Sequence, residues 1–172
     1  MTSGLTPKEF EEILIGSYDR LFGVAFRILG SKEDAEDVVQ GVCLEAPTRF
    51  ESFRAEASCT TWLYRIAVNR SIDMLRARRR RSKANLEWGE VEGQRRAEIS
   101  AQQDQRRDLA ELMTSLEDAD RALLSLMMVE GLTQAEVSEA LDIPAGTVGW
   151  RVSRIKDRMR AVAEKGGYRD AS

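Results

Sequence analysis

The side chains best suited to bind a ligand lie in one basic segment, residues 60–81, which contains seven arginines and a single aspartate. This local net charge of +6 contrasts with a formal charge of −3 for the whole chain of 172 residues. Guanidinium groups bind phosphates, aromatic rings stack on bases, and amides hydrogen-bond base edges. The segment also carries Trp62, Tyr64 and Asn69. A solvated basic face is the ordinary alternative, but this combination favours nucleic-acid binding.

Catalytic and metal-binding chemistry finds little support in the sequence. The chain has no histidine and only two cysteines, Cys43 and Cys59, which cannot form a four-ligand zinc site. No nucleophile–base constellation and no phosphate-binding glycine loop is apparent. We therefore expect no enzyme activity, no cofactor and no bound metal. The two cysteines are expected to be buried thiols, although a redox-sensing pair remains an alternative.

The elements that must position the basic segment are predicted to be helices. Apolar residues within it recur at three- and four-residue spacings, the repeat of a helix with one buried face. A capping box at residues 6–9 predicts a helix that ends at Gly30. Ser31 is expected to begin a second helix with an acidic exposed face, which Pro47 should end or kink. Residues 49–58 then form a connecting loop.

The second half of the chain predicts a helix-turn-helix. Short helices are expected from about residue 107 to 116 and from 122 to an end at Gly131. Thr133 opens another through a second capping box, a tight turn follows at residues 142–146, and a basic helix begins at Thr147. In a helix-turn-helix, the second helix lies in the major groove. A generic antiparallel helical pair does not explain the basic face of the last helix.

The predicted fold class is all-α, with two small helical domains joined by a flexible linker. We place the first domain at residues 1–82, the linker at 83–106, the helix-turn-helix domain at 107–165 and a tail at 166–172. No apolar run reaches the length of a membrane span and the N-terminus does not resemble a signal peptide, so a cytoplasmic location is expected. Acidic and basic blocks alternate along the chain, so the free domains could pack together and hide their DNA contacts.

Three segments together resemble the extracytoplasmic-function (ECF) sigma factors of bacterial RNA polymerase. They are DAEDVVQ at residues 34–40, TWLYRIAVNRSIDMLR at 61–76 and GLTQAEVSEALDIPAGTVGWRVSRIKDRMR at 131–160. The resemblance implies that the first domain binds core polymerase and opens the promoter −10 element. It also implies that the second domain reads the −35 element, and that an anti-sigma factor controls the protein.

The resemblance also implies roles for individual residues. Contact with core polymerase is expected from Asp34, Asp37 and Gln40. Binding and melting of the −10 element is expected from Phe53, Arg54, Arg65, Asn69, Arg70 and Arg76. Binding of the −35 element is expected from Thr133, Gln134, Gly146, Thr147, Trp150, Arg151 and Arg154.

Several residues depart from the family pattern. Gly41 stands where glutamate is usual, Pro47 where tryptophan is common, and Cys59 where an aromatic residue is frequent. Gly149 and Trp150 replace a basic–serine pair, which predicts an unusual −35 sequence and a Trp150 contact with a thymine methyl group or a partner protein. Two alternatives therefore stay open. One is a sigma-like decoy that captures an anti-sigma factor, and the other is a helix-turn-helix regulator that works without polymerase.

Overall fold

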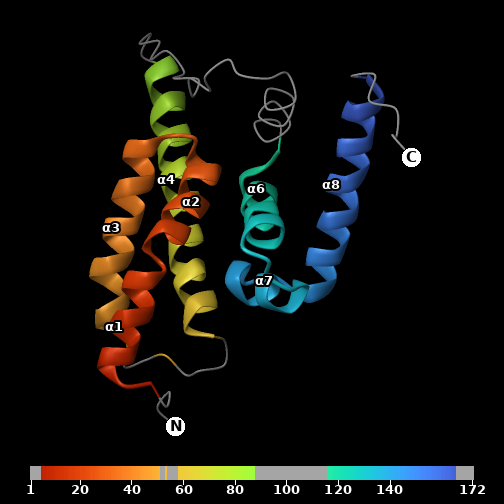
Figure 1. Ribbon diagram of the computed structural model, residues 1–172. Coiled ribbons are helices and arrows are strands. Elements are labelled where there is room, and N and C mark those ends of the chain that lie inside the picture. Colours follow the sequence, from red (N-terminus) through yellow and green to blue (C-terminus); the bar gives the residue numbers. More distant parts are fainter. Residues whose placement is uncertain (1–4, 51–52, 54–57, 88–115, 166–172) are drawn as a thin grey trace.

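The computed structural model describes residues 5–50, 53, 58–87 and 116–165. Within these ranges every regular element is a helix, as the all-α prediction requires (Figure 1). The predicted linker falls largely outside the described residues, as does most of the helix expected at 107–116.

The first bundle contains four helices, α1 (Pro7–Gly16), α2 (Tyr18–Leu29), α3 (Lys32–Arg49) and α4 (Cys59–Glu87). Both predicted caps are present: Thr6 and Glu9 form a capping box at the start of α1, and the Ser31 hydroxyl accepts from the Asp34 amide. Gly30 ends α2 in the left-handed conformation, φ 69°, which glycine adopts without steric cost. Local sequence signals thus set three of these helix ends.

Three boundaries differ from the prediction. The single helix expected before Gly30 is divided at Ser17, whose ψ of −8° departs from the helical value next to the weak helix former Gly16. Pro47 does not end α3, which continues to Arg49. Only two residues of α3 follow Pro47, so the hydrogen bond that its missing amide cannot donate is lost in the last turn of the helix. Helix α4 extends to Glu87, five residues past the predicted end of the first domain.

The core of the first bundle is formed by the faces that α2, α3 and α4 turn toward one another. The contributing side chains are buried apolar residues: Leu21, Val24, Ala25, Ile28, Ala35, Val38, Val39, Val42, Leu63, Ala67 and Val68. At the end near the loop, Phe10 stacks on Phe50 with ring centroids 4.3 Å apart, and Trp62 packs beside both Phe10 and Phe53. Trp62 is therefore a core anchor of α4.

The second bundle contains α6 (Asp118–Leu124), the π-helical turn η2 (Ser125–Val129), α7 (Gln134–Leu141) and α8 (Ala145–Lys165). The predicted capping box of Thr133 and Glu136 begins α7. Asp142 follows in the left-handed region, φ 54°, and the chain enters α8 three residues later. Buried Val137, Ala140, Val148 and Ile155 hold α7 and α8 together against Leu123 and Leu126. This is the expected helix-turn-helix.

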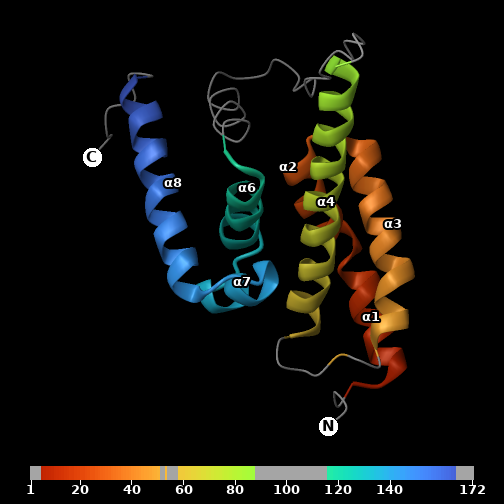
Figure 2. The same cartoon turned by 180° about the vertical axis from the view of Figure 1, so that it is seen from behind.

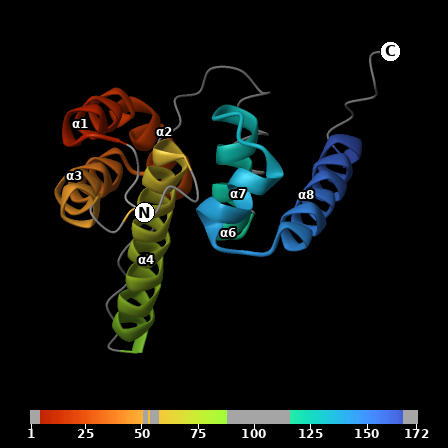
Figure 3. The same ribbon diagram turned by 90° about the horizontal axis from the view of Figure 1, so that it is seen from below.

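The two bundles lie side by side. In three views α6 and α7 lie between α4 and α8 (Figures 1, 2 and 3). Helix α4 packs against α7 and α6, and α2 packs against α6 and η2. Helix α8 is thus the outermost element, with one side toward α6 and the other open to solvent. Within the described ranges, no helix has both the length and the apolar character needed to span a bilayer.

Candidate nucleic-acid and polymerase interface

The acidic face predicted to meet core polymerase lies on α3. Asp37 and Gln40 are exposed there. Asp34 is half-buried, and its carboxylate accepts from Nη1 of Arg78 on α4 at 2.6 Å. Asp37 and Gln40 thus present polar groups to solvent, while Asp34 helps to hold α3 against the basic helix.

The basic helix α4 carries the residues predicted to bind the −10 element. Asn69 is exposed, and so are Arg65, Arg70 and Arg76. Each of these arginines forms an ion pair: Arg65 with Asp142 at 3.1 Å, Arg70 with Glu45 at 2.6 Å and Arg76 with Asp73 at 3.3 Å. Exposed ion pairs contribute little stability, so the guanidinium groups can exchange a carboxylate for a DNA phosphate at small cost.

Gly41 explains how Arg70 reaches Glu45. A Cβ atom at this buried position of α3 would collide with the Arg70 guanidinium group. The missing side chain therefore lets Arg70 lie across α3 and pair with Glu45. The departure from the family pattern at residue 41 thus has a packing consequence for a predicted DNA-binding arginine.

The loop before α4 carries two of the residues predicted to bind and melt the −10 element, Phe53 and Arg54. Phe53 is buried and packs against Trp62 with ring centroids 5.3 Å apart. A stacking platform requires an accessible ring face, so in this structure Phe53 acts in packing. Arg54 lies outside the described residues. The DNA roles of both residues stay predictions.

The start of the helix-turn-helix presents several of the predicted −35 residues. Thr133, Gln134 and Gly146 are exposed. Thr147 is half-buried, and its amide donates to the Pro144 carbonyl at 2.8 Å. That amide is therefore already engaged, and a phosphate bound at this helix terminus would have to use other donors.

Arg151 and Arg154 of α8 are held inside their own domain. Arg151 donates to Oδ1 of Asp120 at 2.7 Å, and Arg154 donates to Oδ2 of the same carboxylate at 2.5 Å. Asp120 lies on α6 and is fully buried. Sequence reasoning missed Asp120, because its partners are 31 and 34 residues away and no short motif links them.

Trp150 is the large side chain that the beginning of α8 leaves accessible. It is 59% exposed. The Arg154 guanidinium carbon lies 4.8 Å from the centre of its ring, a cation–π contact. The pair thus connects the buried Asp120 to an exposed aromatic surface.

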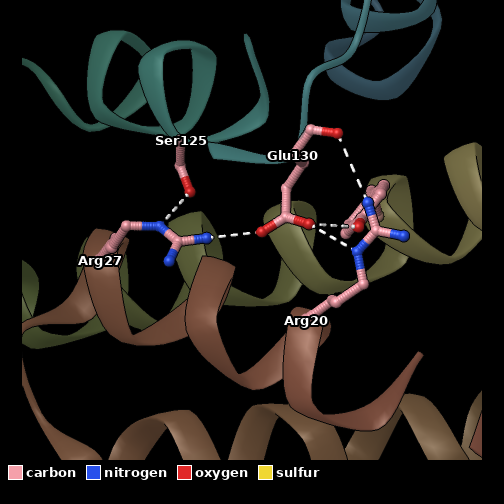
Figure 4. Close-up of polar contacts among 5 residues, drawn as sticks. Arg20, Arg27, Ser125 and Glu130 are labelled. Carbon is pink, nitrogen blue, oxygen red and sulfur yellow. Dashed lines mark hydrogen bonds and ion pairs between the residues drawn. The ribbon is translucent and has the colours of Figure 1, made fainter. Parts of the chain in front are cut away.

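A second cluster, formed by Arg20, Arg27, Tyr64 and Glu130, joins the two bundles (Figure 4). Glu130, next to η2, has a side chain only 5% exposed. Its carboxylate accepts from Arg27 Nη2 at 2.7 Å, from Arg20 Nε at 2.8 Å and from the Tyr64 hydroxyl at 2.7 Å. Arg27 Nε also donates to the hydroxyl of Ser125 at 2.7 Å. We call these four residues the Glu130 cluster.

The environment of the Glu130 cluster fixes its charges. Burial alone would raise the pKa of Glu130, but hydrogen bonds from Tyr64 and Arg20 and the charges of both arginines lower it below the usual 4.5. Burial and the hydrogen bond to Glu130 raise the pKa of Tyr64 above its usual 10. At neutral pH the carboxylate is therefore ionised and the phenol is protonated.

Other polar contacts extend the same junction. Arg65 pairs with Asp142 of the turn between α7 and α8, and Arg79 donates to Asp118 of α6 at 2.8 Å. A shallow groove of about 490 Å³ lies between α4 and α7, bordered by Thr61, Trp62, Arg65, Ser138, Glu139, Asp142, Ile143 and Pro144. Part of the basic surface of α4 is thus occupied by the helix-turn-helix domain.

The cysteines and acidic residues show no metal-binding arrangement within the described part of the chain. No group of three potential ligands there could hold a metal ion. Cys59 is buried and Cys43 is half-buried, and burial raises the pKa of both thiols. A raised pKa lowers the reactive thiolate fraction, as expected for packing residues.

Comparison with known proteins agrees with this geometry. The profile of sigma-70 region 2 matches residues 14–81, and that of sigma-70 region 4 matches residues 106–159. The ECF RNA polymerase sigma factor RpoE of Cereibacter sphaeroides is 32% identical, with 76% of this chain and 70% of the relative covered. The ECF RNA polymerase sigma-E factor of Escherichia coli K12 is 30% identical, covering 73% and 72%. SigW of Bacillus subtilis is 28% identical, covering 88% and 87%.

Solved structures share the fold. The sigma factor RpoE of Bartonella quintana, in complex with the anti-sigma factor NepR, superposes with a TM-score of 0.72 at 22% identity, covering 91% of this chain and 98% of the other. CnrH in complex with the cytosolic domain of CnrY gives a TM-score of 0.66 at 19% identity, covering 93% and 90%. Taken with the two sigma-70 regions in their expected order, these relatives confirm the resemblance, and the chain belongs to the ECF RNA polymerase sigma factor family.

Proposed function

We propose that this protein is a promoter-specificity subunit that binds core RNA polymerase in the cytoplasm and directs it to particular promoters. The observation that carries the proposal is the shared bundle of α3 and α4, in which exposed Asp37 and Gln40 lie on one helix and Asn69 with its arginines on the other. One domain can then bind polymerase and promoter together, while α8 contacts the −35 duplex. This role is non-catalytic, since polymerase performs the chemistry.

The mechanism follows from the chemistry of the two faces. An exposed acidic helix is electrostatically complementary to a basic polymerase surface, which favours rapid and specific association. Arg65, Arg70 and Arg76 would exchange their carboxylate partners for backbone phosphates. Asn69, which is exposed on the same helix, would contact the separating strands at the −10 element.

We also propose that the packed arrangement of the two bundles is the inactive form of the free protein. Arg65 and Arg79 of the basic helix pair with acidic residues of the second bundle. Arg65 is among the residues predicted to bind the −10 element, so that contact requires its ion pair with Asp142 to open. A partner that binds both bundles at once, as an anti-sigma factor would, could stabilise the packed form.

The direct test is reconstitution with core polymerase, followed by run-off transcription on genomic fragments. We expect co-purification and new start sites. Asp37→Arg should abolish co-purification through charge reversal, whereas Glu12→Arg, an exposed change on α1, should not. Asn69→Ala should retain core binding and reduce transcription from duplex templates, with a smaller effect on templates already unpaired at the −10 element.

The alternative of a sigma-like decoy makes the opposite prediction. The replacement of a basic–serine pair by Gly149 and Trp150 favours it, because DNA contacts could have been lost there. A decoy would fail to bind core polymerase while binding an anti-sigma factor tightly. Co-purification with core polymerase that Asp37→Arg abolishes would exclude it.

A further inference from the structure

The cationic side chains at the start of α8 are occupied within the domain. Arg151 and Arg154 each bind one oxygen of the buried Asp120 carboxylate. The Nε atoms of both arginines are also shielded from solvent. A base contact that drew either guanidinium away from Asp120 would leave a fully buried carboxylate short of a partner, which is strongly unfavourable. The two arginines therefore anchor α8 to α6, and this pairing restrains them from turning toward a base edge.

The remaining side chains on the first turns of α8 offer few ways to read a base. Gly149 has no side chain, and a Cβ there would lie 3.7 Å from Oε1 of Gln134, an ordinary contact. Ser153 is exposed but short. Trp150 is large and 59% exposed, and Arg154 holds its ring from one side. The N-terminal residues of a recognition helix face base edges, so the indole is the dominant group presented to the groove.

The chemistry of an indole limits what it can recognise. Its surface is apolar apart from one N–H donor. In the major groove, the distinctive apolar feature is the C5-methyl group of thymine. A tryptophan held by a stacked guanidinium presents a preorganised surface for such a methyl group.

We infer that Trp150 sets the sequence preference of α8 by contacting the C5-methyl group of one thymine in the −35 element, with Asp120, Arg151 and Arg154 as positioning residues. This inference rests on the proposed function. It assigns direct readout to Trp150 and removes it from Arg151 and Arg154, which the family resemblance had placed among the DNA-binding residues. The preferred −35 sequence then contains a thymine whose methyl group is required.

The test replaces each −35 thymidine in turn by deoxyuridine, which differs by that methyl group alone. Run-off transcription first identifies a promoter that the reconstituted holoenzyme uses. Binding of the holoenzyme is then measured on each substituted duplex of that promoter. We expect one position at which the substitution weakens binding about fourfold, the value expected for one buried methyl group. With Trp150→Ala that difference should disappear, while Met159→Ala, a change of an exposed residue farther along α8, should preserve it.

The role of Arg151 as a positioning residue is tested on the same pair of duplexes. Arg151→Lys should weaken binding more on the thymidine duplex than on the deoxyuridine duplex, so that the fourfold ratio becomes smaller, with no change in preference at any guanine position. A base-reading Arg151 would instead change the preference at a guanine position. The inference is overturned if no thymine methyl group matters to the wild-type protein, or if the methyl effect persists in Trp150→Ala. Failure of the wild-type holoenzyme to bind or transcribe any promoter would overturn the proposed function instead.

Discussion

At the scale of single residues, Arg70, which is predicted to bind the −10 element, has a defined resting position that is held only by a weak ion pair. Its guanidinium group lies over Gly41 and pairs with Glu45, yet the side chain is partly exposed. Since exposed pairs of this kind contribute at most about 1 kcal/mol, phosphate can compete for the arginine. The glycine thus favours a particular resting position for Arg70.

Gly41→Ala tests this account. The added methyl group should displace the Arg70 guanidinium from Glu45, while alanine improves helix propensity by about 1 kcal/mol. We expect the free energy of unfolding in urea to rise by up to about 1 kcal/mol. Glu45→Gln serves as the matched control, since it weakens the same ion pair without the propensity gain. A loss of more than about 1 kcal/mol in Gly41→Ala would contradict the packing described here.

Arg151 offers a second residue-scale prediction. Because its hydrogen bond to the buried Asp120 is charge-assisted, Arg151→Ala should reduce the free energy of unfolding by about 1.5–3 kcal/mol. Arg158→Ala, a change of an exposed residue on the same helix, should change it by less than about 0.5 kcal/mol. Equal stabilities of the two variants in a denaturant titration would show that Arg151 is not an anchor.

At the scale of helices, local signals predicted some boundaries and failed at others for identifiable reasons. The capping boxes at Thr6 and Thr133 and the glycine stop at Gly30 act within one turn, so the sequence displays them directly. The break at Ser17 and the continuation of α3 through Pro47 carry no such signal, since neither Gly16 nor a proline two residues from a helix end dictates one outcome. The burial of Phe53 depends on its packing against Trp62, so it could not be read from its loop sequence.

Removal of the second capping box is the element-scale prediction. Thr133→Ala deletes the hydroxyl that accepts from the Glu136 amide and should destabilise the protein by about 1 kcal/mol. Thr133→Ser keeps the acceptor and should retain most of the stability. Both variants lose the threonine methyl group, but only Thr133→Ala also loses the hydroxyl. The difference between their melting temperatures therefore measures the contribution of the cap. Identical melting temperatures for serine and alanine would mean that the cap contributes nothing.

At the scale of the whole molecule, the sequence predicted that opposite charges could join the two bundles, but it did not identify the residues that do so. Alternating acidic and basic blocks predicted that the domains could pack together, and ion pairs do join them. The central partner of Arg20 and Arg27 is Glu130, which lies more than a hundred residues away in sequence. Such a pairing depends on the fold of both bundles, so no local pattern identifies it.

Glu130→Gln is the prediction at this scale. The change keeps the shape of the side chain but removes its charge, so hydrogen bonds from two arginines become weaker by about 1.5–3 kcal/mol in total. We expect a larger radius of gyration in small-angle scattering and faster association with core polymerase. Asp157→Asn, which alters an ion pair within α8, should change neither quantity.

The pH dependence of the packed form provides the more specific signature of the Glu130 cluster. Because the pKa of Glu130 is lowered on packing, its contribution is complete above its usual 4.5 and is lost as pH falls through the lowered value. The pKa of Tyr64 is raised, so its contribution is complete below its usual 10 and is lost as pH rises through the raised value. The difference in radius of gyration between wild type and Glu130→Gln should therefore stay constant from about pH 5 to 9 and shrink in stronger acid. High salt should preserve most of this difference in radius of gyration, since the buried carboxylate of Glu130 is poorly screened. A difference that vanished with salt at neutral pH would assign the packed form to the exposed pairs of Arg65 and Arg79 instead.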